Sequence, residues 1–364
     1  MTARTAPKVR AIDATLVAVP MRRPLGTSAM RITEAPLMLI DLHTEEGVTG
    51  RGYLFCYTKS AGESLLAILK DASSLLAGTA VEPGEIRRIL ESHFRLLGAR
   101  GIVSMALAGI DIACWDILAI AAGLPLARLL GGALRPTPAY NSNGLPLLDP
   151  PAAADEALEL IAEGFAAIKM RLGRARGGDD LAAVRAVRAA IPAEIAVMAD
   201  FNQALSPGAA RERCLQLDGE GLYWIEEPIA HDDYDGCAEL SGMLSTPVQI
   251  GENFAGPRAM SLALGQRASD YVMPDVERIG GVTGWISAAA LADVARIEMS
   301  SHLFHEISSH LLAVTPTAHW IEYVDWADVI LEQPVKAVDG YITPPERPGN
   351  GLRWDAAAVE HYRV

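Results

Sequence analysis

The sequence has few cysteines and no cysteine motif. Its 364 residues include only four, and these form neither a Cys-x-x-Cys pair nor a zinc-type spacing. Scattered thiols of this kind are typical of a reducing compartment, so we expect a cytoplasmic protein. The first residues lack the apolar core of a signal peptide, and no run of 18 uninterrupted apolar residues predicts a membrane span.

Basic residues are also scarce. There are 31 Lys and Arg against 45 Asp and Glu, which gives a formal net charge of −14. A nucleic-acid surface needs clustered Lys and Arg, so this balance argues against a nucleic-acid partner. It suits a protein that concentrates acids around a cation. Half of the residues are apolar, which is enough for a large core, and the length favours one large domain plus a smaller one.

The N-terminal region has the pattern of an α+β domain. Residues 9–19 and 37–55 alternate as strands do and predict a small antiparallel sheet. Between them, residues 24–36 are bounded by prolines and carry apolar side chains in a polar context. This segment is either a loop packed on the surface or a lid that closes over an apolar ligand. Three helical runs and a short helix before Gly131-Gly132 complete a domain over residues 1–132.

From residue 133 the pattern changes to regular alternation of strands and helices. Eight candidate strands favour a (β/α)₈-type barrel over residues 133–325 rather than a doubly wound sheet. The predicted strands are 137–142, 166–171, 195–200, 222–226, 247–252, 271–274, 297–301 and 319–323. In such barrels the chemistry collects at the C-terminal ends of the strands. Residues 326–364 are rich in Pro and Gly, and we expect them to return to the first domain.

Three acids end three of these strands at a fixed spacing. Asp200, Glu226 and Glu252 lie 26 residues apart, about one strand plus one helix. Neighbouring parallel strands are about 4.8 Å apart, so the three carboxylates would converge. They would repel one another unless a cation lay between them, and an oxygen-only cage suits Mg²⁺. The alternative is that they are ordinary solvated acids at strand ends.

Other polar residues fall at the same strand ends. Lys169 and Arg171 are two apart on one strand, so both point into the barrel, either as functional cations or as an ordinary buried ion network. His302 and Asp275 end adjacent strands, where the carboxylate would orient the imidazole and raise its basicity. His305, by contrast, is interpreted as a packing residue.

Glu322, on the last strand, faces the same end of the barrel. Beside other acids it would either stay protonated and donate a hydrogen bond to a substrate anion, or serve as a salt-bridge partner.

These motifs resemble the enolase superfamily, mandelate racemase subgroup. The resemblance covers nearly the whole chain and is carried by AIKMRLG, ADFNQAL, WIEEP, QIGEN, MPD followed by IGGVTGW, SSHLFHEISSHLLAVTPTAHWIE, PLMLIDLHTEEGVTGRGYLFCYT and AGIDIACWD. It implies an α/β fold, a modified (β/α)₇β barrel under an N-terminal α+β capping domain, and a homo-oligomer. It also implies Mg²⁺, with Mn²⁺ as a substitute.

The resemblance assigns roles by position. It implies metal ligands at Asp200, Glu226 and Glu252, a His302–Asp275 dyad, and Glu322 as electrophile. Asn202, Lys169 and Ser142 would lie near the substrate carboxylate and hydroxyl. The presumed apolar side of the pocket comprises Leu25, Ala29, Ile32, Phe55, Tyr57 and Val324.

One position departs from the family pattern. Members that racemise with two bases carry Lys-x-Lys, and here the second place holds Arg171. Arginine stays protonated near neutral pH, so it is a poor base. His302 would then be the sole base, and the guanidinium would orient a carboxylate or stabilise the enediolate.

Three functions follow from these patterns. The first is abstraction of the proton α to the carboxylate of an apolar or aromatic 2-hydroxy acid, through an enediolate, by a racemase or epimerase. The second is an acid-sugar dehydratase that uses His302, favoured by Arg171 and by Arg31 in the presumed lid. The third is a catalytically silent, metal-dependent binding protein. Each implies a small carboxylate as the ligand and no membrane partner.

Overall fold

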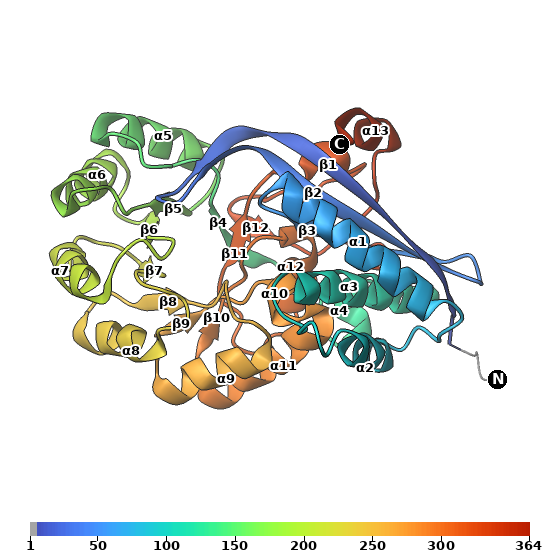
Figure 1. Ribbon diagram of the computed structural model, residues 1–364. Helices are drawn as coiled ribbons and strands as arrows, with labels where there is room; N and C mark the ends of the chain where they lie inside the picture. Colours follow the sequence, from blue (N-terminus) through green and yellow to red (C-terminus); the bar gives the residue numbers. More distant parts are fainter. Residues whose placement is uncertain (1–5) are drawn as a thin grey trace.

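The N-terminal domain is a three-stranded sheet covered by helices. The computed structural model describes residues 6–364. The antiparallel sheet has the order β1-β2-β3, with β1 at Val9–Gly26, β2 at Arg31–Thr44 and β3 at Thr49–Phe55. The helices are α1 (Lys59–Leu76), α2 (Pro83–His93), α3 (Ile102–Ala122) and α4 (Leu126–Leu129). The predicted sheet and its helices are therefore present (Figure 1).

Helix α3 is the core of this capping domain. It packs on β3 so closely that a Cβ atom at Gly50 would lie 2.1 Å from the carbonyl oxygen of Ala113. Its length and composition would allow it to cross a membrane, but 67% of its most apolar 18-residue window is buried inside the protein. It also carries two buried acids, Asp111 and Asp116. These features are those of the central helix of a folded domain.

Residues 24–36 are mostly strand, which corrects the prediction of a loop. Strands β1 and β2 continue as a paired hairpin to the pairs Leu25–Ile32 and Gly26–Arg31, and only residues 27–30 form the turn. The register shifts between Pro20 and Leu25, so Pro24 lies in an irregular stretch of an edge strand, where a proline is tolerated. The hairpin reaches from the capping domain across the barrel toward α5 (Figure 1).

The second domain is a barrel of parallel strands. They run in the order β10-β9-β8-β7-β6-β5-β4-β11, and a bridge between Met299 and Ala318 joins the two ends. The strands are β4 (Thr137–Asn141), β5 (Ala167–Arg171), β6 (Ala196–Asp200), β7 (Trp224–Glu226), β8 (Val248–Ile250), β9 (Tyr271–Val272), β10 (Glu298–Met299) and β11 (Ile321–Tyr323). All eight match predicted strands. The barrel and its capping domain are thus confirmed.

Helices surround the barrel between successive strands (Figure 1). They are α5 (Pro150–Ala162), α6 (Gly177–Ala190), α7 (Pro207–Leu217), α8 (Tyr234–Met243), α9 (Pro257–Gln266), α10 (Val276–Ile279), α11 (Gly281–Ala295) and α12 (His305–Leu312). Sequence periodicity did not predict α8, α10 or α12. The last two are short, and α12 is buried along its whole length, so it shows no polar face.

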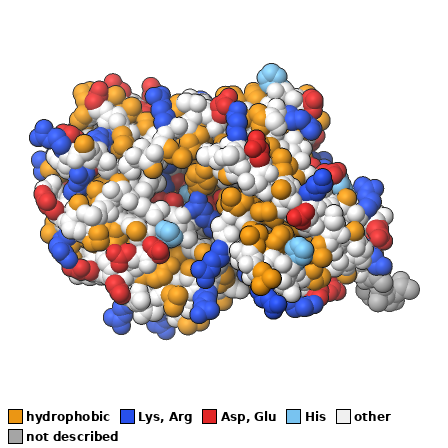
Figure 2. All heavy atoms as spheres, viewed as in Figure 1, with side chains coloured by type: hydrophobic (Ala, Val, Ile, Leu, Met, Phe, Trp, Pro, Cys, Tyr) orange, Lys and Arg blue, Asp and Glu red, His pale blue; other side chains and the backbone are white. Residues whose placement is uncertain are grey.

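The C-terminal segment lies against both domains. It contains the 3₁₀ helix η1 (Asp328–Ile330), strand β12 (Tyr341–Ile342), which pairs with β4, and helix α13 (Ala356–Tyr362). The Trp354 indole donates to both carboxylate oxygens of Asp41 at 3.2 Å, and Arg363 bridges to Val17 of β1. On the face shown in Figure 2, basic and acidic side chains are interspersed among hydrophobic ones, and the surface is hollowed between the barrel and the capping domain.

Candidate active site

Strand register brings the three predicted acids together. Asp200 of β6 lies opposite Glu226 of β7, and Glu252 follows β8, the next strand in the barrel. One carboxylate oxygen from each of the three lies within 4.8 Å of the others. All three residues are at most 7% exposed. The prediction that these side chains converge at one end of the barrel is therefore met.

This set of donors fits a divalent cation. Burial raises the pKa of Glu226, Lys169 lowers it, and Asp200, Glu322 and Glu252 raise it further, to about 8. The raised pKa of Glu226 shows that the positive charge of Lys169 only partly offsets burial and the negative charge of the neighbouring carboxylates. Three converging carboxylates are the hard oxygen ligands that Mg²⁺ prefers.

Neighbouring groups fix the acids in place. The Asn202 backbone N–H and its side-chain amide donate to the two oxygens of Asp200 at 2.7 and 2.9 Å, and the Trp224 indole donates to Glu226 Oε2 at 3.0 Å. Asn202 adopts φ +45°, a conformation that Asn tolerates better than most residues. Its Oδ1 atom is buried and has no hydrogen-bond partner within residues 6–364. Asn202 thus orients the Asp200 carboxylate, and its own Oδ1 remains available to accept a hydrogen bond from a ligand.

Lys169 is buried among the acids. Its Nζ atom lies 2.6 Å from Glu226 Oε1, 2.8 Å from Glu322 Oε1 and 3.5 Å from Asp200 Oδ2. Burial lowers the pKa of Lys169, but the nearby carboxylates outweigh it and hold that pKa well above its usual value. The side chain is therefore a fixed positive charge at the base of the site.

His302 and Asp275 form the predicted pair. His302 Nδ1 lies 2.6 Å from Asp275 Oδ2, and the other ring nitrogen, Nε2, lies 3.2 Å from Glu252 Oε2 and 3.8 Å from Glu322 Oε2. Burial lowers the pKa of His302, but Glu252, Glu322 and Asp275 raise it to about 10. The imidazole with this pKa is protonated near neutral pH. A cation beside Glu252 would offset part of that negative charge and lower the pKa from this value.

The surroundings of Glu322 favour its ionised form. Its Oε1 accepts from Ser142 Oγ at 2.7 Å as well as from Lys169, and its Oε2 accepts from the Leu303 N–H at 2.9 Å. Burial raises the pKa of Glu322, but Lys169, His302 and Arg171 lower it further than burial raises it. Of the two predicted roles, the structure favours the salt-bridge partner, because a carboxylate surrounded by donors has no proton to give.

Arg171 is held by backbone and side-chain acceptors. Its Nη1 donates to the Ser142 carbonyl at 2.9 Å, and its Nη2 donates to Ser142 Oγ at 3.0 Å. Its Nε is buried and has no partner in the described part of the chain. Ser142 therefore positions Arg171 and Glu322, and its predicted place beside the substrate stays a prediction.

A cavity of about 200 Å³ joins these groups to the β1–β2 hairpin. Its lining comprises Leu25, Thr27, Ala29, Met30, Phe55, Tyr57, Lys169, Arg171, Asp200, Asn202, Gln203, Glu252, Asn253, Arg278, His302, Leu303, Glu322 and Trp326. Leu25 and Tyr57 lie where they were predicted. Ile32 and Val324 do not, because both are buried in the hydrophobic core.

Arg278 is a site residue that the sequence analysis missed. Its guanidinium donates to the Asn253 side-chain oxygen and, at 2.7 Å, to the Tyr57 hydroxyl, and it lies 5.1 Å from the centre of the Tyr57 ring. The available signal was its position three residues after Asp275, just beyond a strand end. Asn253 and Gln203 were also missed, although each directly follows a predicted site residue.

Family models match both parts of the chain. The model described as mandelate racemase / muconate lactonizing enzyme, N-terminal domain, matches residues 11–131. The model described as enolase C-terminal domain-like matches residues 152–358.

Individual relatives extend over the full fold. An enolase from alpha proteobacterium BAL199, solved with bound magnesium, is 44% identical and covers 98% of this chain and 100% of its own, with a TM-score of 0.96. An enolase from Bradyrhizobium, solved with magnesium and mandelic acid, is 42% identical over 100% of both chains, with a TM-score of 0.94. The L-talarate/galactarate dehydratase of Salmonella typhimurium is 29% identical over 96% of this chain and 90% of its own length. The chain therefore belongs to the enolase superfamily, in the mandelate racemase / muconate lactonizing enzyme group.

Proposed function

We propose that this enzyme removes the α-proton of a 2-hydroxy acid that carries an apolar or aromatic side chain. His302 is the base, and Asp200, Glu226 and Glu252 hold Mg²⁺. The observation that carries the proposal is the position of His302, which Asp275 orients at 2.6 Å and which lines the same cavity as Asp200 and Glu252. The magnesium-bound structures of related enolases support the choice of cation.

The α-proton of a carboxylate is weakly acidic, so negative charge must be stabilised as it leaves. A bound Mg²⁺ would supply Lewis-acid stabilisation of the substrate carboxylate. Lys169 adds a fixed positive charge. The Nε–H of Arg171 has no hydrogen-bond partner within residues 6–364 and could donate to the substrate. These two cations would orient the carboxylate, while His302 Nε2 accepts the proton.

The apolar wall of the cavity indicates the class of side chain. Phe55 lies between Tyr57 and Trp326, with ring centroids 4.4 and 5.0 Å away, and Leu25 and Met30 of the hairpin complete this wall. A surface of this kind suits a phenyl or branched aliphatic group better than a chain of hydroxyls. The Bradyrhizobium relative was solved with mandelic acid, a 2-hydroxy acid with a phenyl group.

Arg171 limits the stereochemical course. Because arginine does not release a proton near neutral pH, and its two terminal nitrogens donate to Ser142, it does not act as a base. With His302 as the sole base, one enantiomer of the substrate loses its α-proton and regains a proton on the same face.

A second candidate is an acid-sugar dehydratase. Polar side chains of Asn202, Gln203, Asn253 and Arg278 line part of the cavity and would bind hydroxyl groups. The dehydratase from Salmonella is related over nearly the whole chain. In this reaction His302 would take the α-proton and then return a proton to the departing β-hydroxyl, which leaves as water.

Proton exchange in D₂O tests these functions. The enzyme with Mg²⁺ is incubated with each enantiomer of mandelate and of aliphatic 2-hydroxy acids, and NMR follows the α-hydrogen. We expect exchange in one enantiomer without loss of optical rotation. Exchange of both enantiomers with racemisation would contradict the single-base course. A 2-keto product from an acid sugar would select the dehydratase, and no exchange with any of these acids would favour a binding protein.

We also propose that the enzyme is a homo-oligomer. Light scattering of the purified chain measures its mass in solution, and the mass of a single chain of 38.8 kDa would contradict this.

A further inference from the structure

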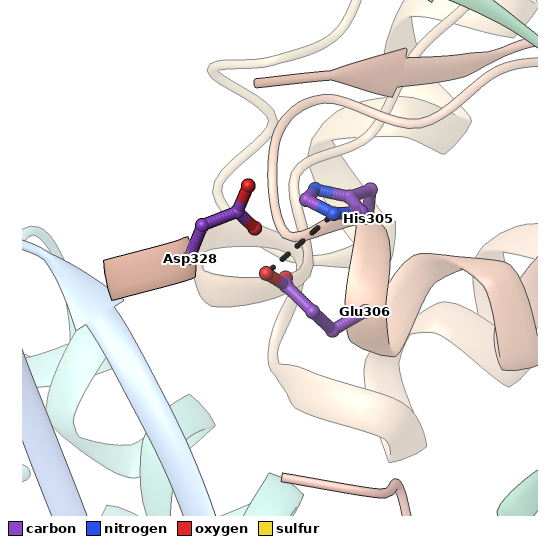
Figure 3. A group of neighbouring side chains, drawn as sticks. All are labelled: His305, Glu306 and Asp328. Atoms are coloured by element: carbon purple, nitrogen blue, oxygen red, sulfur yellow. Dashed lines mark ion pairs between the residues drawn. The ribbon is translucent and has the colours of Figure 1, made fainter. Parts of the chain in front are cut away.

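A second group of potential metal ligands lies at the start of helix α12. His305 and Glu306 are its first two residues, and Asp328 is the first residue of η1 (Figure 3). One potential ligand atom from each lies within 4.8 Å of the others. Their side chains are 1%, 2% and 10% exposed. None of the three lines the active-site cavity.

Each of these side chains has one polar atom with a hydrogen bond and one without, and Glu306 Oε1 also faces His305 Nε2 at 3.6 Å (Figure 3). His305 Nε2 lies 2.9 Å from the Val335 carbonyl oxygen, Glu306 Oε2 accepts from the Tyr53 hydroxyl at 2.7 Å, and Asp328 Oδ2 accepts from the Lys336 ammonium. In contrast, His305 Nδ1, Glu306 Oε1 and Asp328 Oδ1 are buried without a hydrogen-bond partner within residues 6–364. Buried polar atoms in folded proteins usually have partners, so these three atoms point to a bound ligand.

The anchored atoms match the surroundings of metal ligands. A ligating histidine usually donates its second ring N–H to a carbonyl or carboxylate, and a ligating carboxylate is itself hydrogen-bonded. The Val335 carbonyl takes a ring N–H of His305, which leaves a lone pair on the other nitrogen. Tyr53 and Lys336 hold one oxygen of each acid. Each of the three side chains is thus held through one polar atom, which leaves its other polar atom available to coordinate a metal.

Charge and donor type indicate a cation. Within residues 6–364 the two carboxylates form a salt bridge with one ammonium, that of Lys336. An anion would be repelled by this group. A site that combines imidazole nitrogen with carboxylate oxygen suits Zn²⁺ and similar first-row ions, whereas Mg²⁺ prefers oxygen alone.

We propose that His305, Glu306 and Asp328 form a second metal site, which binds a divalent first-row transition-metal ion such as Zn²⁺. The site joins three parts of the fold: α12, η1 of the C-terminal segment and, through Tyr53, strand β3 of the capping domain. Asp328 and Lys336 also line a surface cavity of about 480 Å³, which offers a route for the ion. Its role is to hold the capping domain, the barrel and the C-terminal segment together.

Zinc binding in the presence of Mg²⁺ tests this proposal. Asp200→Asn weakens the active-site cage, so titration of this variant with Zn²⁺ under excess Mg²⁺ reports mainly on the second site. We expect one equivalent of Zn²⁺ and a rise in the melting temperature. In the double variant Asp200→Asn/Asp328→Asn, we expect the affinity for Zn²⁺ to fall by at least about tenfold. Anomalous diffraction at the zinc edge should place the ion between His305, Glu306 and Asp328.

Lys336→Met removes the ammonium that holds one oxygen of Asp328. The Lys336 side chain is 54% exposed, so its loss should leave the fold intact, and Zn²⁺ binding should weaken by about tenfold because Asp328 is no longer held. Zinc affinity that is the same with and without Asp328→Asn would overturn the proposal. So would an anomalous signal confined to the active-site cage, or no zinc binding in the Asp200→Asn protein.

Discussion

Among single residues, His302 has the most specific proposed role, because we propose that it is the group that accepts the proton. His302→Asn removes the base, while its amide can still donate to Asp275, as the ring does now at 2.6 Å. We expect α-hydrogen exchange to fall by about 10²–10⁴-fold, the usual contribution of a general base, with Mg²⁺ affinity little changed. NMR exchange and calorimetric titration measure the two quantities. A variant that still exchanges at the wild-type rate would show that another group is the base.

We propose that Arg171, which is not a base, restricts the reaction to one face of the substrate. Arg171→Lys would replace a guanidinium held by Ser142 with an amine that can lose its proton, close to the positive charge of Lys169. We expect this variant to exchange the α-hydrogen of the second enantiomer slowly, which the parent enzyme does not do. Arg171→Met is the control, because it removes the guanidinium without supplying a base. Equal behaviour of the lysine and methionine variants would contradict this role.

Sequence patterns predicted the positions of most site residues, because these side chains share one simple geometry. Asp200, Glu226 and Glu252 each end or closely follow a parallel strand, so regular spacing alone brings them together. Ser142 and Glu322 were placed at the correct strands, but their hydrogen bonds to each other and to Arg171 and Leu303 were not predicted. Their roles depend on which donors surround them, and those donors come from strands and loops far apart in the chain. Linear patterns carry no information on such contacts.

At the scale of elements, the β1–β2 hairpin forms one wall of the active-site cavity. Met30 at its turn is 40% exposed and lines the cavity. Met30→Ala removes apolar area that would cover the substrate, about 1 kcal/mol, so we expect KM for an aromatic 2-hydroxy acid to rise roughly fivefold with kcat nearly unchanged.

The matched control for this variant is Val294→Ala on helix α11, since Val294 is 86% exposed and does not line the cavity. Steady-state kinetics of the two variants should differ in KM alone. A Met30→Ala enzyme with the wild-type KM would show that the hairpin does not contact the substrate.

The elements that periodicity predicted well are those with one buried and one exposed face, or a continuous apolar run. Residues 24–36 were misread because prolines and glycine suggested a loop, although Pro24 lies at a register shift of the edge strand β1 and Gly26 at its end. Helix α12 was missed because tertiary packing buries its polar residues, among them His305 and Glu306. In both cases the neighbours in three dimensions, absent from a local pattern, decide the structure.

At the scale of the whole molecule, two buried histidines connect stability to pH. Burial lowers the pKa of His310 to about 4, with Arg347 lowering it further and the nearby Asn350 backbone opposing this. Burial also lowers the pKa of His319 to about 4. Between pH 6.5 and 4 the unfolded chain therefore binds more protons than the folded chain. The stability that neutral histidines provide above pH 6.5 is lost as pH falls through this window, by roughly 3 kcal/mol per residue.

His310→Asn tests this linkage. Asparagine can still accept the Ala127 N–H, which His310 Nδ1 accepts at 3.2 Å, but it does not titrate. We expect the free energy of unfolding of the variant to depend less on pH between 4 and 6.5 than that of the parent, as urea denaturation at several pH values would show. His361→Asn, at an exposed position, is the control. Parallel profiles for the parent and His310→Asn would contradict the assignment.

The proposed proton abstraction depends on a cation bound between Asp200, Glu226 and Glu252, beside His302. Anomalous diffraction from crystals of the enzyme grown with Mn²⁺ locates that ion directly. We predict a peak in contact with one carboxylate oxygen of each of the three acids. A map with manganese bound elsewhere, and no peak between these side chains, would contradict the account.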